Sequence, residues 1–463
     1  MAAAVLAGVL ATASAPALAA TSADGWDPRV AGIAKQVEKL RGIEFDHPVP
    51  VKVLDSAAFD KRFTRDQKPT TKSRKEWAES EAALRALGLL DRPVPLESLT
   101  AGVGAQVLGF YDPAEKAIVV RGDTFSSPET RSTLAHELTH ALQDQQFGLS
   151  RMDRLERKAD SSSVSALIEG DATRIGETYT SGLSKSDQAE IDASNASTVS
   201  TAPDLPPFVN VSFASEYVLG YMMTSVLEAA GGTKAIDRAF RDPPLNDLAI
   251  IDPVALLDGT KAIPVAAPKL AGGNTALGTP TVLGAETLYF MLASHLPPAD
   301  ALAVAQRWGG DSSIAFTRGD STPCVTSVMV GRAGAADTQA LQAGLERWNT
   351  ASGANAEITR RGKELTLTSC EPSNPGTVSE AALSQALFHV LLRNSFATGV
   401  LSGSDARTAT CIADGIMGLD SLTKAIATVQ TPDDDLPADF DTTIAAEVKA
   451  NAPRLRAQCQ KTT

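Results

Sequence analysis

Residues 127–144 of this 463-residue chain read SPETRSTLAHELTHALQD, and this segment decides how the rest of the sequence is interpreted. His136 and His140 are four residues apart, and Glu137 directly follows the first histidine. An α-helix turns about 100° per residue, so both imidazoles would project from one face, one turn apart. Two imidazoles in that position can bind one Zn²⁺. The segment therefore has the H-E-x-x-H pattern of zinc-dependent hydrolases.

Helix-start signals precede this motif. Ser127 is a favourable N-cap, Pro128 is favoured at the first helical position, and Glu129 adds negative charge to the first turn. Gly148 is the first residue after the motif that ends a helix well. The sequence therefore predicts a helix that begins after Ser127 and ends before Gly148.

Two other interpretations of the histidine pair fit less well. Two core imidazoles one turn apart are hard to bury without a metal. A di-iron carboxylate bundle would use the E-x-x-H segment that begins at Glu137, but it needs a second such segment. Glu169 is followed three residues later by Ala172, so it does not supply one.

A zinc site of this kind needs a third protein ligand and leaves the fourth position for water. His295, His389 and a downstream carboxylate are the options. His389 lies in a predicted C-terminal helical unit, and His295 lies beyond a linker. Glu169 lies on the next predicted helix among apolar residues, where a free charge would be unfavourable. Gly170 beside it permits close helix–helix approach, so we predict Glu169 as the third ligand.

The segments HELTHALQDQQF (136–147) and ALIEGDA (166–172) together resemble the gluzincin-type zinc metallopeptidases, in particular a set of secreted bacterial, mainly actinobacterial, proteins. The resemblance includes LGFYDP (108–113) and covers roughly residues 45 to 370. It implies that His136, His140 and Glu169 bind Zn²⁺ and that Glu137 activates water. The implied core is zincin-like, with a small sheet, the HExxH helix and a Glu-bearing helix.

One position departs from the pattern of these relatives. They often have His-Pro shortly after a Pro-Pro pair, whereas this chain has Asp252-Pro253. If that histidine assists the reaction, the departure puts activity in doubt. The alternative to a peptidase is therefore a catalytically inactive zincin-fold protein with a binding or scaffolding role.

The chemistry expected of the site is peptide hydrolysis. Zinc lowers the pKa of a bound water toward neutrality, and Glu137 would act as the general base. The expected partner is a peptide or protein substrate of unknown sequence. Four residues are candidates for stabilising the oxyanion, namely Tyr111, Tyr217, Tyr221 and His295. Asp144 and Asp171 are candidates for holding the outer nitrogens of the imidazoles.

Composition points to export. Residues 1–20 are apolar and small, as in a secretory signal peptide, with a cleavage site expected near Ala19-Ala20. The basic residues that usually come before the apolar core of a signal peptide are missing. Later segments lack the roughly 18 consecutive apolar residues of a membrane span. The net charge of −13 argues against nucleic acid as a partner. Four cysteines predict two disulfides, for which we favour Cys324–Cys370 and Cys411–Cys459.

The expected fold class is α+β. Within the part after the signal peptide we predict one long helix over 152–182 and a mobile surface loop over 185–207. The predicted units are a signal peptide (1–20), a zinc metallopeptidase-like domain (28–262), an accessory α/β unit (276–372) and an all-helical C-terminal domain (376–463).

Overall fold

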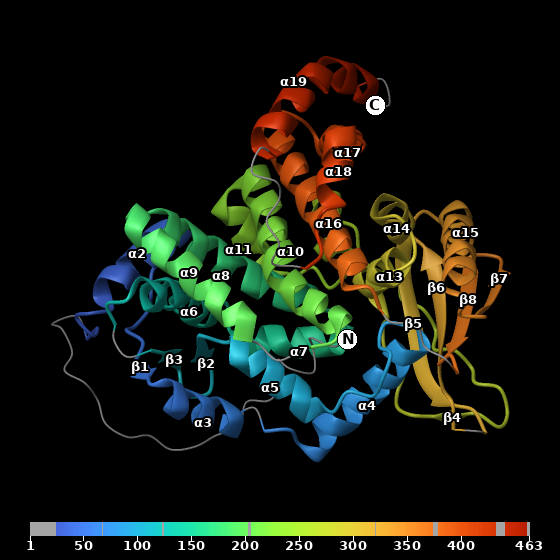
Figure 1. Cartoon of the computed structure of the whole chain (residues 1–463), viewed down its shortest axis with the longest axis horizontal. Coiled ribbons are helices and arrows are strands. Elements are labelled where there is room, and N and C mark those ends of the chain that lie inside the picture. Colours follow the sequence, from blue (N-terminus) through green and yellow to red (C-terminus); the bar gives the residue numbers. More distant parts are fainter. Residues whose placement is uncertain are drawn as a thin grey trace.

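The computed structural model describes residues 25–66, 68–122, 125–201, 205–319, 321–373, 378–431 and 440–460. The predicted signal peptide lies outside these ranges. The chain combines many helices with two small sheets, which confirms the α+β class. Figure 1 shows the smaller sheet below the helices on the left, the larger sheet on the right and the C-terminal helices at the top.

The smaller sheet contains β1 (Val51–Leu54), β2 (Gly109–Asp112) and β3 (Ala117–Arg121) in the order β1-β3-β2. β1 is parallel to β3, and β2 is antiparallel to it, so β2 and β3 form a hairpin. β2 is therefore an edge strand. The helices that precede β2 are α2 (Ala31–Arg41), α3 (Ser56–Asp66), α4 (Thr71–Ala86) and α5 (Leu96–Gln106).

Helix α6 (Pro128–Phe147) packs on β2 and β3 and carries the histidine motif. Ser127 is its N-cap and accepts a 3.1 Å hydrogen bond from the Thr130 amide. Gly148 ends the helix in the left-handed conformation with φ of 74°. Both predicted ends of this helix are therefore confirmed.

The prediction of one helix over 152–182 is wrong, because the segment forms α7 (Leu149–Ala159) and α8 (Ser163–Ser181). Asp160 interrupts it with a left-handed φ of 52°. Aspartate tolerates this conformation better than most residues, and here its carboxylate accepts a hydrogen bond from the Val282 amide. The contact links the break to a segment distant in sequence.

The predicted loop over 185–207 is also wrong, because residues Lys185–Thr201 form helix α9. Residues 202–204 lie outside the described part. The Ser184 hydroxyl caps the start of α9 through the Asp187 amide, at 3.1 Å. Asp187 also pairs with Arg131 of α6 at 2.8 Å. These tertiary and capping contacts outweigh a composition rich in Ser and Thr.

Helix α10 (Pro207–Gly231) packs closely against α8. A Cβ added to Gly170 would lie 2.0 Å from the carbonyl carbon of Gly220, so the two helix backbones touch at these glycines. This confirms that Gly170 permits a close approach, with α10 as the helix approached. The next elements are α11 (Thr233–Arg241), α12 (Leu248–Ile251) and the short 3₁₀-helix η1 (Pro253–Leu256).

The larger sheet is antiparallel, with strand order β4-β5-β6-β8-β7. Its strands and helices are β4 (Thr275–Ala276), α13 (Gly284–Ala293), α14 (Pro298–Ala305), β5 (Trp308–Thr317), β6 (Pro323–Gly331), α15 (Ala335–Ser352), β7 (Glu357–Arg361) and β8 (Glu364–Cys370). The disulfide Cys324–Cys370 joins β6 to β8, as predicted.

Helix α4 packs against this sheet although it belongs to the N-terminal part of the sequence. Arg85 pairs with Glu371 at 2.8 Å, and the Ser369 hydroxyl donates to the Ala86 carbonyl at 2.6 Å. One hydrophobic cluster extends from Trp77 on α4 to Leu367 on β8. The predicted domain boundaries stay predictions, and the units that they separate share a core.

The remaining described elements are all helical, as expected. They are α16 (Glu380–Leu401), α17 (Ala406–Met417), α18 (Asp420–Ile426) and α19 (Phe440–Cys459). The predicted disulfide Cys411–Cys459 joins α17 to α19. α16 packs along α10 and so connects these helices to the part of the chain that carries the histidines. Among the helices described, none is long and apolar enough to cross a membrane.

Candidate metal centre

Three predicted ligands converge at the contact between α6 and α8. The Nε2 atoms of His136 and His140 lie 3.0 Å apart. The Glu169 Oε2 atom lies 3.3 Å from each of these nitrogens. Ligand atoms bound tetrahedrally to zinc at about 2.0–2.1 Å are separated by about 3.3–3.4 Å. The triangle formed by the three side chains therefore has the dimensions of one face of a zinc tetrahedron.

The donor set also fits a metal ion. Glu169 Oε2 is buried and has no hydrogen-bond partner in the described structure. An unsatisfied buried oxygen is costly, and a cation between it and the two imidazoles would remove that cost. Within the described ranges, these three residues are the one group of His, Cys, Asp and Glu side chains that could hold a metal ion. His295 and His389 do not belong to it.

The pKa values of these groups depend on one another. Burial acts to lower the pKa of His140, but Glu169, together with Glu137 and Gln143, outweighs burial and raises the pKa to about 9. Burial acts to raise the pKa of Glu169, but the two imidazoles outweigh it and hold the pKa below its usual value. The site therefore favours positive charge between these side chains, in the form of a proton or of a metal ion.

Glu137 lies on the side of α6 that faces strand β2. Its side chain is buried, and burial raises its pKa. A backbone hydrogen bond from Tyr111 acts in the opposite direction. A Cβ at Gly109 would lie 2.7 Å from the Thr133 methyl group and 3.3 Å from the Glu137 Cγ atom. The glycine thus lets the edge strand lie directly against the expected general base.

A series of buried hydrogen bonds supports the outer ring nitrogen of His140. The His140 Nδ1 atom lies 3.1 Å from Gln143 Oε1, and Gln143 Nε2 donates to Asp171 at 3.2 Å. Asp171 accepts a 2.7 Å hydrogen bond from Arg41. Asp171 was a predicted support residue, and it acts through Gln143. Arg41 and Gln143 were not predicted, because Arg41 lies 130 positions from Asp171 in the sequence and the orientation of the Gln143 amide depends on acceptors of α8.

Asp144, the other predicted support residue, has different partners. Its carboxylate accepts hydrogen bonds from the Tyr111 hydroxyl, at 2.8 Å, and from Lys116. Tyr111 is thereby held away from an oxyanion role. Tyr217 of α10, another predicted oxyanion candidate, stacks its ring on His136 with centroids 6.2 Å apart.

Several further carboxyl groups, outside the three proposed ligands, are also buried. Burial raises the pKa of Glu156 and Glu286 to about 7 each, and that of Asp247 to about 6. Burial also raises the pKa of Glu216 well above its usual value. Ser165 donates to Glu156, and Ser215 donates to Glu286. These two hydrogen bonds act to lower the pKa values of Glu156 and Glu286, and burial outweighs them.

Asp252, which stands where the resembled metallopeptidases often have histidine, is held by an ion pair and a hydrogen bond. Its carboxylate pairs with the buried Arg393 of α16 at 3.1 Å and accepts a 3.0 Å hydrogen bond from Gln306. Arg393 also pairs with Asp414 at 2.7 Å. Asp252 therefore connects η1 to the C-terminal helices.

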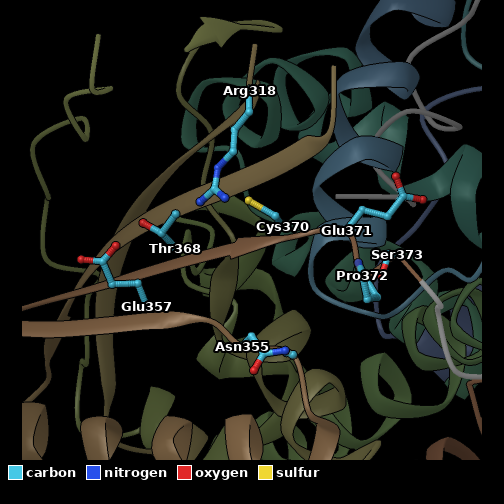
Figure 2. A pocket seen from close by; sticks show the side chains of 9 residues that line it. Arg318, Asn355, Glu357, Thr368, Cys370, Glu371, Pro372 and Ser373 are labelled. Atoms are coloured by element: carbon cyan, nitrogen blue, oxygen red, sulfur yellow. The ribbon is translucent and has the colours of Figure 1, made fainter. Parts of the chain in front are cut away.

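A separate cavity of about 400 Å³ lies at one end of the larger sheet (Figure 2). Arg318, Glu357 and Glu371 are its charged lining residues, and the disulfide-bonded Cys370 also lines it. The cavity is lined by no histidine and by none of the predicted site residues. Its chemistry does not match that of the metal centre.

Comparisons of the chain with protein-family models, with curated proteins and with solved structures found no match. The resemblance to gluzincin-type metallopeptidases therefore stays a prediction based on the motifs.

Proposed function

We propose that this protein is a secreted zinc-dependent peptidase with a zincin-like core. The observation that carries the proposal is the convergence of His136, His140 and Glu169, with Glu137 buried beside an edge strand. The three side chains would hold Zn²⁺. When bound, zinc would act as a Lewis acid that polarises the substrate carbonyl and lowers the pKa of water. The two disulfides support an extracellular location.

Residues of the chain would bind the substrate, transfer the proton and stabilise the oxyanion. An extended peptide would add to the free edge of β2 as another strand, which would align its backbone above α6. Glu137 would take a proton from the attacking water and return it to the leaving amine nitrogen. The Tyr217 hydroxyl, next to His136, would donate to the developing oxyanion.

The test compares the wild-type protein with a Glu137→Gln variant. We expect zinc in both proteins and peptide-library cleavage in the wild type alone, with a rate loss of at least about 10²-fold, as for removal of a general base. Metal analysis and mass spectrometry of the digests provide the readouts.

Absence of zinc from the wild type would contradict both the metal site and the peptidase. Zinc in both proteins with no cleavage by the wild type would instead favour the inactive binding or scaffolding protein. An active wild type would also yield cleavage sites, from which the substrate class can be determined.

A further inference from the structure

Gln143 lies between a metal-binding histidine and a buried ion pair. Its side chain is fully buried on α6, one turn after His140. Gln143 Oε1 lies 3.1 Å from His140 Nδ1. Gln143 Nε2 lies 3.1 Å from the Ile168 carbonyl oxygen and 3.2 Å from Asp171 Oδ2. The side chain thus touches both helices that carry the proposed ligands.

The partners of Gln143 determine which way its amide points. A backbone carbonyl and a carboxylate can only accept hydrogen bonds, so the amide NH₂ group must face Ile168 and Asp171. The amide oxygen, which can only accept, is then left facing His140. His140 must therefore donate from Nδ1, and the lone pair of its neutral ring is placed on Nε2.

The acceptor at Asp171 is itself fixed. Arg41 donates to Asp171 Oδ2 at 2.7 Å, and Arg174 donates to Oδ1 at 3.0 Å. Arg41 is fully buried and also lies 2.8 Å from Asp237 of α11. Two guanidinium groups from α2 and α8 therefore hold this carboxylate in one orientation. A reversed Gln143 amide would place its oxygen against that carboxylate.

We propose that Gln143 is a positioning residue that fixes His140 in the Nδ1–H tautomer, with the Nε2 lone pair directed at the metal, and that Arg41 and Asp171 lock the Gln143 amide. This inference rests on the proposed zinc site. Residues that hold the outer nitrogen of a ligating imidazole commonly change metal affinity about 10–100-fold when they are replaced.

The experiment measures the zinc dissociation constant of the full-length chain by competition with a chromophoric chelator. Gln143→Met keeps a similar volume and removes every hydrogen bond, and we expect it to weaken zinc binding by about 10–100-fold. Gln143→Glu keeps an acceptor for Nδ1–H but places its second oxygen against Asp171 and the Ile168 carbonyl, so we expect a zinc affinity between those of the wild type and of Gln143→Met. Thr139→Val is the matched control, because Thr139 is buried on α6 and donates to the Ala135 carbonyl alone.

The outcomes separate this inference from the proposed function. A wild type without zinc overturns both. If Gln143→Met binds zinc as tightly as Thr139→Val, the role of Gln143 alone is overturned. An equal loss of zinc affinity in Gln143→Met and Gln143→Glu also overturns it, because a change in packing would then explain both. If the variants do not fold, ¹⁵N spectra of histidine-labelled, zinc-loaded wild type decide the matter. Zinc on His140 Nε2 with a protonated Nδ1 is expected, and zinc on Nδ1 overturns the proposal.

Discussion

At the scale of single residues, the contacts of Asp252 in the fold change how its departure from the motif is interpreted. The metallopeptidases that the motifs resemble often have histidine where this chain has Asp252. The absence of that histidine raises the question whether a catalytic group is missing. In the fold the residue is 6% exposed, and its carboxylate pairs with Arg393 and accepts a hydrogen bond from Gln306. The residue therefore has a structural reason to be an aspartate.

We predict that Asp252→His destabilises the protein by about 3–5 kcal/mol, the usual cost of removing one partner from a buried ion pair. It should not increase peptide cleavage. Urea unfolding and the peptide-library digest measure the two quantities, and Asp258→His, at an exposed position, is the control with a change within about 0.5 kcal/mol. A stable variant with faster cleavage would show that position 252 belongs to the reaction.

The sequence predicted the three proposed metal ligands and Asp171 as a candidate support residue, but not Arg41 or Gln143. Spacing alone places His136 and His140 on one face of a helix, and an apolar setting singles out Glu169. Arg41 and Gln143 escaped notice for different reasons. Arg41 lies on a helix far away in sequence, and Gln143 acts through the orientation of an amide, which depends on acceptors from a second helix.

At the scale of elements, the position of Glu169 depends on the contact between α8 and α10. The two backbones touch at Gly170 and Gly220, where a side chain on either helix would meet main-chain atoms that cannot move alone. Glu169, the proposed metal ligand, is the residue directly before this contact. Any change in the helix spacing therefore moves a ligand.

We predict that Gly170→Ala destabilises the protein by about 3 kcal/mol, because α8 and α10 must separate. Zinc affinity should fall as well, since Glu169 moves away from the histidines. Gly399→Ala on α16 is the control, where nothing lies within 4 Å of the added methyl group and stability should rise by about 0.5–1 kcal/mol. Urea unfolding with a zinc titration tests both variants, and equal stabilities would refute the close-contact argument.

Elements were predictable where local signals agree with the fold. Helix α6 has a cap, a proline and a terminal glycine, and its ends were predicted correctly. The break between α7 and α8 has no glycine or proline, and a left-handed aspartate held by Val282 makes it instead. Helix α9 has weak intrinsic propensity and is held by Arg131 of α6. In both failures a tertiary contact decided the structure.

At the scale of the whole molecule, buried carboxyl groups make stability depend on pH in an unusual direction. Most paired carboxylates have lowered pKa values and lose their stabilising effect in acid. Burial instead raises the pKa of Glu286 to about 7, well above the value of roughly 4.3 expected in the unfolded chain. Between these two values the folded protein binds more protons than the unfolded chain, so this contribution falls as pH rises.

We therefore predict that Glu286→Gln gains stability relative to the wild type as pH rises from about 4.3 to 7, by about 1–3 kcal/mol in total. The amide stays neutral and still accepts the hydrogen bond from Ser215. Urea unfolding of metal-free protein at pH 5, 6, 7 and 8 measures the difference, and exposed Glu364→Gln is the control. A difference independent of pH would mean that Glu286 ionises in the folded protein as readily as in the unfolded chain.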